Sequence, residues 1–260
     1  MLAQSTPVPI FSADPRPRNL ILSTARTALA VLAVSLYVFL LGPPFLLWTL
    51  ITRRPAALYW IGASGVRTGF ALAGITLRVT GREHLRAGTV YACNHTSNIE
   101  PPALFLALRE LHPRLRVLYK AELRKLPILV WAFDIAGFVP LERANKDQSW
   151  TAVDGAAAAL REGNSFFIFP EGTRSKTGEL LPFKKGGLIM AIKAQAPIVP
   201  VAVSGARDAM RKGSPLIWPT TVTVALQPAV PTAGRTIEDR DAVIAEVRAG
   251  IARGLRRDGG

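Results

Sequence analysis

The pattern of apolar and polar positions divides the chain into two parts. Between positions 27 and 52 the chain carries 26 consecutive residues without a charge, TALAVLAVSLYVFLLGPPFLLWTLIT. As one helix this run would extend about 39 Å, enough to cross the apolar core of a bilayer. Beyond position 74, short β-rich runs alternate with helical stretches. The pattern predicts a flexible leader over 1–20, a helical anchor over 21–73 and an α/β domain over 74–260.

The apolar run predicts attachment to a membrane. Gly42-Pro43-Pro44 lies inside it, and proline removes a backbone donor and disfavours the helical conformation of the preceding residue. We therefore expect a break at these residues. Arginines flank the run on both sides, so the positive-inside bias gives no orientation. A kinked re-entrant hairpin is favoured over a spanning helix, and a buried core helix is the third interpretation.

The part after position 74 has the pattern of an α/β fold. The expected strands are 75–80, 89–93, 116–120, 137–141, 165–169, 198–203 and 221–226. Helical patterns lie between several of them, and an amphipathic helix preceded by a Thr-x-x-Asp capping signal closes the chain. This order predicts a mixed sheet flanked by helices, in which chemistry gathers at the carboxyl ends of strands.

The first candidate junction is NHTSNIEPP, residues 94–102, directly after an expected strand. Proline suits the first turn of a helix, so a helix should begin at Pro101. With His95 in the preceding turn, the loop can fold Glu100 back onto the imidazole. Such a pair would make His95 a general base that Glu100 orients. The spacing alone is a weak signal, because a histidine and a carboxylate often share a polar loop.

The single cysteine, Cys93, excludes an internal disulfide. It precedes His95 by two residues, so a Cys–His nucleophile pair is one interpretation. A small buried residue that ends a strand is the simpler one.

The second candidate junction is FPEGTRSKTGELLPFKKGG, residues 169–187. A glycine allows close backbone approach, and backbone N–H groups, a hydroxyl and a guanidinium can bind an oxyanion. Two lysines and two glycines then open the next helix, another place that favours anions. A phosphate site and a solvated basic hairpin fit this stretch equally well.

Charge narrows the class of partner. The formal net charge is +14, which favours a polyanion or an anionic membrane surface, although a basic source composition could also produce it. The sequence lacks zinc-finger spacing, RNP-like strands and basic heptads, so nucleic acid is not expected. It also lacks a G-x-S-x-G elbow and any spacing of histidines and carboxylates typical of metal ligands.

Together the two junctions resemble the 1-acyl-sn-glycerol-3-phosphate acyltransferases of the glycerolipid acyltransferase superfamily. That family has four ordered blocks, which here correspond to NHTSNIE, GFVPLER ending at Arg143, FPEGTRS, and the strand PIVPV at 197–201. YKAELRKLP, which contains Lys120, also matches the family pattern between the first two blocks. The resemblance covers roughly residues 75–230, and the apolar segment resembles the anchor of bacterial members.

The resemblance implies transfer of a fatty acyl group from acyl-CoA or acyl carrier protein to the free hydroxyl of lysophosphatidic acid, without a cofactor or metal. In this scheme His95 is the base and Glu100 orients it. The residues that bind the acceptor phosphate or shape its pocket would be Lys120, Arg143, Glu171, Gly172, Thr173 and Arg174. The implied location is the cytoplasmic face of the bacterial inner membrane, where membrane lipids supply the acceptor.

The sequence departs from the family at one position. Glu100 stands where the family nearly always has aspartate, and the extra methylene lengthens the side chain by about 1.3 Å. Three interpretations follow: the pair works with altered geometry, it serves another lysolipid acceptor, or the chain is a non-catalytic lipid-binding homologue.

Overall fold

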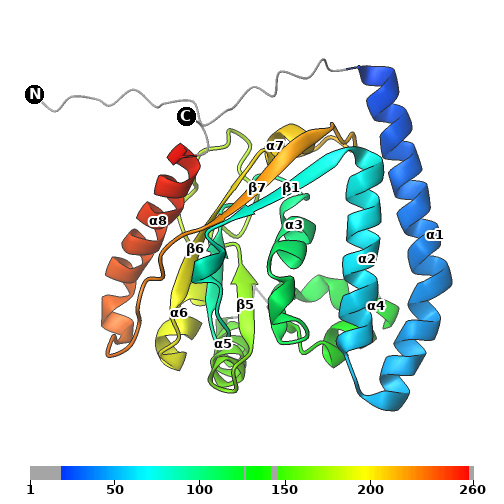
Figure 1. The fold of residues 1–260 in the computed structure, drawn as a ribbon. Helices are drawn as coiled ribbons and strands as arrows, with labels where there is room; N and C mark the ends of the chain where they lie inside the picture. The colour runs from blue at the N-terminus through cyan, green and yellow to red at the C-terminus, as the bar shows by residue number, and fades with distance from the viewer. Residues whose placement is uncertain (1–18, 126, 142–145, 258–260) are drawn as a thin grey trace, which may run out of the picture.

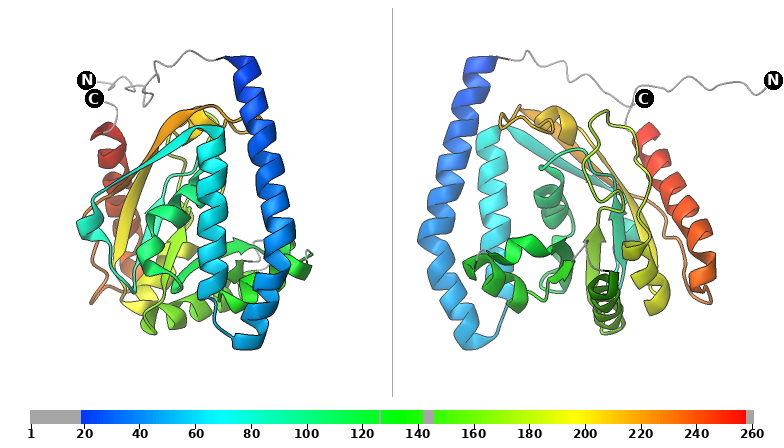
Figure 2. Two further views of the ribbon diagram at one scale, coloured as in Figure 1. Left: turned by 45° about the vertical axis from the view of Figure 1, so that its right-hand side comes forward. Right: turned by 180° about the vertical axis from the view of Figure 1, so that it is seen from behind.

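The computed structural model describes residues 19–125, 127–141 and 146–257. An N-terminal helical hairpin packs beside a sheet that carries helices on both faces (Figure 1). The hairpin consists of α1 (Leu20–Thr52) and α2 (Ala56–Ala73), which lie side by side and run in opposite directions in every view (Figure 2). Most of the expected leader falls outside the described residues.

All seven expected strands are present, and their ends differ from the expected ones by at most two residues. They are β1 (Ile75–Thr80), β2 (Val90–Cys93), β3 (Leu115–Lys120), β4 (Val139–Leu141), β5 (Ser165–Ile168), β6 (Ile198–Ser204) and β7 (Thr220–Leu226). Within the described ranges the sheet order is β1-β7-β6-β2-β5-β3-β4. β6 pairs with β7 antiparallel and every other neighbouring pair is parallel, which confirms the mixed α/β sheet.

Helices connect the strands much as the pattern predicts. They are α3 (Glu100–Ala107), α4 (Pro127–Ile135), α5 (Lys146–Arg161), α6 (Gly186–Ala194), α7 (Ala206–Ala209) and α8 (Arg240–Arg257), with short 3₁₀ turns η1 (Arg82–His84), η2 (Arg109–Leu111), η3 (Ala121–Lys125) and η4 (Ile237–Asp239). The Thr236–Asp239 capping box is present before α8. The helix expected from Pro101 begins one residue earlier, so Glu100 belongs to its first turn.

The central strand β2 has apolar packing on both sides, as is typical of a parallel strand in the middle of a sheet. Tyr91 and Cys93 belong to the apolar cluster shared with α2 and α3. Val90 and Ala92 face the opposite way, into the cluster shared with α5, α6 and α8. All four residues are fully buried, which fixes the end of β2 and therefore the start of the turn that follows.

The predicted break at Gly42-Pro43-Pro44 is wrong, because α1 continues through both prolines to Thr52. Each proline removes one backbone hydrogen bond from the helix. However, α2 contacts α1 both before and after the two prolines. Before them, the Tyr37 hydroxyl donates to the Ile61 carbonyl at 3.1 Å. After them, the Phe45 ring stacks on Trp60 with centroids 6.0 Å apart. The hairpin turn lies instead at positions 53–55.

Much of the apolar surface of α1 faces outward. Among the described helices, α1 has the length and composition needed to cross a membrane, and only 11% of its most apolar 18-residue window is buried. Its exposed large apolar residues are Leu20, Ile21, Leu22, Leu29, Val31, Leu32, Leu36, Val38, Phe39, Leu40, Leu41, Leu47, Trp48, Leu50 and Ile51. This exposure does not fit a buried core helix and is the property expected of a membrane-associated segment.

Candidate active site

Two turns meet because their strands are neighbours. β2 and β5 are parallel and in register, with Ala92 opposite Ile168, so the chain leaves both strands at the same edge of the sheet. His95 follows β2 and Glu171 follows β5. The backbone N–H of His95 donates to Glu171 Oε1 at 2.7 Å, which joins the two junctions directly.

The expected histidine–carboxylate pair is formed. His95 Nδ1 lies 2.6 Å from Glu100 Oε2. The Glu100 side chain is completely buried, whereas 16% of the His95 side chain is exposed. The position of Glu100 in the first turn of α3 is favourable for a carboxylate, because the helix dipole is positive there.

The Glu100 carboxylate also binds the turn that precedes its own helix. The Thr96 N–H donates to Oε1 and Oε2 at 2.8 and 2.9 Å, the Thr96 hydroxyl donates to Oε1 at 2.6 Å, and the Ser97 N–H donates to Oε1 at 3.2 Å. A buried carboxylate needs such donors to replace the hydrogen bonds that water would otherwise supply. The longer glutamate side chain therefore fits this turn with its hydrogen bonds satisfied.

Neighbouring elements hold the turn itself in place. The buried Asn94 side chain donates to the Val203 carbonyl at 2.9 Å and accepts from the Val203 N–H at 2.7 Å, which fastens the turn to β6. The Ser97 hydroxyl donates to the Met210 carbonyl at 2.7 Å, after α7. These bonds fix the backbone on both sides of His95.

The imidazole of His95 is oriented by stacking as well as by hydrogen bonding. Its ring lies over Phe169 with centroids 4.0 Å apart and an interplanar angle of 21°. The Ser175 N–H donates to the His95 carbonyl at 2.7 Å. Because Nδ1 is engaged with Glu100, Nε2 is the ring nitrogen left for a substrate hydroxyl.

Glu171 joins the backbones of two loops. Its Oε1 accepts from the His95 N–H and its Oε2 accepts from the Leu181 N–H at 3.0 Å. Burial raises the pKa of this carboxyl, the two backbone donors oppose the rise, and the charge of Glu100 adds to it. The contacts give Glu171 a positioning role toward His95, while its expected part in the acceptor pocket remains a prediction.

The turn after Pro170 has a backbone that depends on glycine. Gly172 has φ +67°, and a Cβ there would lie 2.9 Å from carbons of the Lys184 side chain. Its N–H donates to the Phe169 carbonyl at 3.0 Å. The tight turn leaves Thr173 exposed and Arg174 partly exposed beside the His95 turn. The expected role of these residues in binding the acceptor phosphate stays a prediction.

Sequence reasoning missed Lys212, which contacts the turn that contains Arg174. Its Nζ donates to the Arg174 carbonyl at 2.8 Å and lies 3.4 Å from the Thr173 hydroxyl. Lys212 follows α7, 38 residues after Arg174, and no sequence signal links the two. Thr96 and Phe169 were missed as well, although both lie inside the recognised blocks.

Two expected site residues remain, and the structure describes the position of only one of them. Lys120 is the last residue of β3, which pairs with β5. Arg143 lies outside the described residues. Within the described ranges, no group of three or more histidines, cysteines or carboxylates could hold a metal ion.

Cys93 is a structural residue. It is fully buried at the end of β2, and its thiol donates to the Tyr91 carbonyl at 3.7 Å. Burial, and then the nearby charge of Glu100, raise the pKa of the thiol well above its usual value. The thiolate that a nucleophile requires is therefore disfavoured, which excludes the Cys–His interpretation.

Comparisons with known proteins identify the family of this chain. A family model described as Acyltransferase matches residues 76–204. The 1-acyl-sn-glycerol-3-phosphate acyltransferase of Cocos nucifera is 31% identical over 218 residues, which cover 82% of this chain and 69% of that protein. The enzyme of the same name from Limnanthes douglasii is 34% identical over 65% of this chain, and the match spans 59% of its length.

A solved structure has the same fold. The crystal structure of the 1-acyl-sn-glycerophosphate (LPA) acyltransferase PlsC from Thermotoga maritima superposes with a TM-score of 0.72 and 24% identity, covering 90% of this chain and 97% of that one. The family match includes both the His95 and the Arg174 turns, and the Cocos nucifera alignment extends well beyond them. The chain therefore belongs to the 1-acyl-sn-glycerol-3-phosphate acyltransferase family.

Proposed function

We propose that this protein transfers a fatty acyl group from the thioester of acyl-CoA or acyl carrier protein to the free hydroxyl of lysophosphatidic acid, giving phosphatidic acid. The observation that carries the proposal is the His95–Glu100 pair, 2.6 Å apart and joined through Glu171 to the FPEGTRS turn. The names of the relatives support the same reaction.

In the proposed reaction His95 Nε2 accepts the proton of the acceptor hydroxyl. The hydroxyl oxygen attacks the thioester carbonyl, and a tetrahedral intermediate forms. When this intermediate collapses the C–S bond breaks, and the imidazolium returns its proton to the departing thiol. Glu100 holds the ring and stabilises its positive charge. No covalent acyl-enzyme is needed, which agrees with the buried, protonated Cys93.

The acceptor phosphate would bind on the Arg174 side of the site. Arginine can bind a phosphate through two parallel N–H groups, and the Thr173 hydroxyl and Gly172 backbone lie in the same turn. Lys120 and Arg143 are proposed as further cations for this phosphate. Lys212 would hold the turn through the Arg174 carbonyl, leaving the guanidinium available to the ligand.

A different lysolipid acceptor is the second candidate, because Glu100 replaces the family's aspartate. The hydrogen bonds that Glu100 receives from Thr96 and Ser97 favour a working base over a non-catalytic lipid-binding homologue. Either acceptor uses the same proton transfer at His95.

The test is release of free thiol by the purified protein in detergent, with acyl-CoA or acyl carrier protein as donor and a panel of lysolipids as acceptors. We expect release with lysophosphatidic acid and formation of phosphatidic acid. Release only with another lysolipid would select the second candidate. A complete lack of release with every donor and acceptor would contradict both enzymatic proposals.

We also propose that α1 attaches the protein to the cytoplasmic face of the bacterial inner membrane, with the hairpin entering one leaflet. The exposed apolar surface of α1 and the net charge of +14 support this arrangement. The exposed Ala245 on α8 offers a site for cysteine labelling. Ala245→Cys should react in inside-out membrane vesicles, and reaction only in right-side-out vesicles would reverse the proposed orientation.

A further inference from the structure

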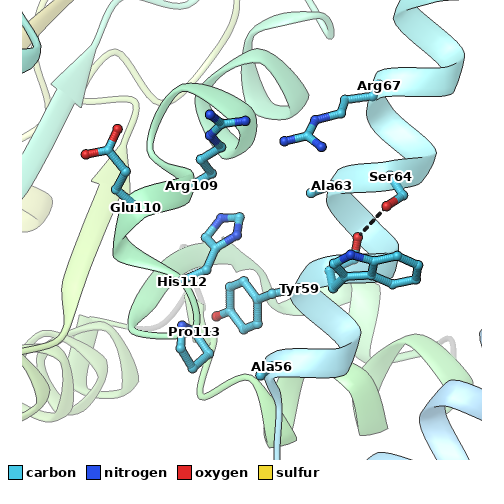
Figure 3. A pocket seen from close by; sticks show the side chains of 10 residues that line it. Ala56, Tyr59, Ala63, Ser64, Arg67, Arg109, Glu110, His112 and Pro113 are labelled. Carbon is cyan, nitrogen blue, oxygen red and sulfur yellow. Dashed lines mark hydrogen bonds between the residues drawn. The ribbon is translucent and has the colours of Figure 1, made fainter.

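A pocket of about 400 Å³ lies between α2 of the hairpin and the segment that follows α3 (Figure 3). Glu100 begins α3 at the active site, whereas the pocket lies beyond the other end of that helix, at Arg109 and His112. The pocket is therefore separate from the candidate active site.

Two guanidinium groups face each other across this pocket. Arg67 extends from α2 and Arg109 extends from η2 toward the same space (Figure 3). Both residues are exposed, and neither has an ion-pair partner among the described side chains. The Glu110 carboxylate turns away from the pocket and lies 2.7 Å from Arg82 Nη1. Two cations that share a space in this way favour an anion that both can bind.

The ring of His112 belongs to the inner wall of the pocket, and its Nε2 is buried behind the pocket surface. Among the described residues, His112 Nε2 is the buried side-chain nitrogen or oxygen without a hydrogen-bond partner. The His112 ring packs against Tyr59 and Phe105, with centroids 4.8 and 4.4 Å apart. Burial lowers the pKa of His112 to about 4, opposed by a hydrogen bond to the Phe105 backbone. The ring is then neutral, so Nε2 can accept a hydrogen bond from a hydroxyl.

The outer rim of the pocket is apolar and continuous with α1. Trp60 lines the pocket, is 62% exposed and stacks on Phe45 of α1. Leu47, Trp48, Leu50 and Ile51 extend this exposed apolar surface along the last turns of α1. A ligand that fits would therefore have an anionic head, a hydroxyl group and an apolar tail.

We propose that this pocket binds the headgroup of an anionic membrane phospholipid, with the phosphate between Arg67 and Arg109 and a headgroup hydroxyl at His112. The acyl chains would lie along Trp60 and α1. Such a bound lipid would connect the hairpin to the α/β domain at the membrane surface. The proposal does not depend on the acyl-transfer reaction.

The test uses the full-length protein in detergent micelles, titrated with phosphatidylglycerol or phosphatidylcholine and monitored by native mass spectrometry. We expect the wild type to retain phosphatidylglycerol in preference to phosphatidylcholine. Arg67→Gln/Arg109→Gln should bind phosphatidylglycerol about tenfold or more weakly, because both charged hydrogen bonds are lost. Both positions are exposed, so the variant should keep the wild-type fold, and thermal unfolding checks this directly.

The matched control is Arg253→Gln/Arg256→Gln on α8. It also removes two arginine charges, but from the opposite side of the molecule (Figure 1). This control and His95→Ala should bind phosphatidylglycerol as the wild type does, so binding can be separated from the proposed activity. Equal binding by the two double variants would overturn the proposal. Displacement of the lipid by millimolar inorganic phosphate would also overturn it, in favour of a soluble phosphate ligand.

Discussion

Each end of α3 has a histidine beside it, and the two surroundings differ. Before the helix, His95 lies against a buried carboxylate, with Nδ1 at 2.6 Å from Glu100 Oε2. After the helix, His112 packs against the rings of Tyr59 and Phe105, and its Nε2 has no hydrogen-bond partner among the described residues. No carboxylate in the described part of the chain holds the second ring, and the neighbouring Glu110 is paired with Arg82.

The difference explains why His95, and not His112, is proposed as the base. The Glu100 carboxylate is fixed by Thr96 and Ser97, so it can hold the His95 tautomer and stabilise a proton gained at Nε2. Burial lowers the pKa of His112, and none of the described carboxylates orients its ring, so it can accept a hydrogen bond but is poorly suited to hold a proton. The same type of side chain is therefore proposed to act as a base at one end of α3 and as a hydrogen-bond acceptor for a ligand at the other.

The largest expected effect comes from removing the base. His95→Ala should lower kcat for acyl transfer about 10³-fold, because the acceptor hydroxyl then lacks a group to take its proton. Thiol release measures the rate, and thermal unfolding checks the fold. His84→Ala is the control, since His84 lies in the surface turn η1, and it should leave the rate unchanged. Residual activity of His95→Ala within tenfold of wild type would exclude His95 as the base.

The next effect tests the carboxylate that distinguishes the two histidines. Glu100→Ala and Glu100→Gln should each lower kcat about 10²-fold or more, since both remove the charge that stabilises the imidazolium. Glu100→Asp keeps the charge and should retain activity within about tenfold. Steady-state kinetics of the three variants provide the measurement. If Glu100→Ala matched the wild type, the orienting role of Glu100 would be wrong.

The smallest expected effect is the change in folding stability with pH that comes from the titration of His112. Its pKa is lowered to about 4 in the folded state, so the unfolded chain binds the extra proton first as the pH falls below about 6.5. Stability from this group is present at neutral pH and is lost progressively between pH 6.5 and 4, by at most about 2 kcal/mol from pH 7 to 5.

Thermal unfolding in detergent checks whether stability falls as the pH is lowered. The melting temperature of the wild type should fall by roughly 5 °C more between pH 7 and pH 5 than that of His112→Phe, which keeps an aromatic ring but cannot titrate. Arg67, Arg109 and Glu110, the charged residues lining the pocket, are unchanged in both proteins. Identical pH profiles would show that His112 does not titrate in this range.

Local patterns predicted most of the fold because each depends on a few neighbouring residues. The seven strands follow from short β-rich runs, and the capping box before α8 follows from Thr236 and Asp239. The prolines of α1 misled the same reasoning, because packing of Tyr37 and Phe45 against α2 outweighs the two lost backbone hydrogen bonds. Lys212 could not be predicted, since its contact with the Arg174 turn depends only on how the loops fold.

The sequence predicted the two candidate turns and, together with the family resemblance, the pairing of His95 with Glu100, because residues five apart in one turn can meet without the rest of the fold. Only the tertiary structure decided how the two turns combine. Parallel pairing of β2 with β5 brings Glu171 to the backbone of His95 across 76 positions of sequence. It also decided that His112 lies in an aromatic pocket facing Arg67, because α2 packs against the end of α3.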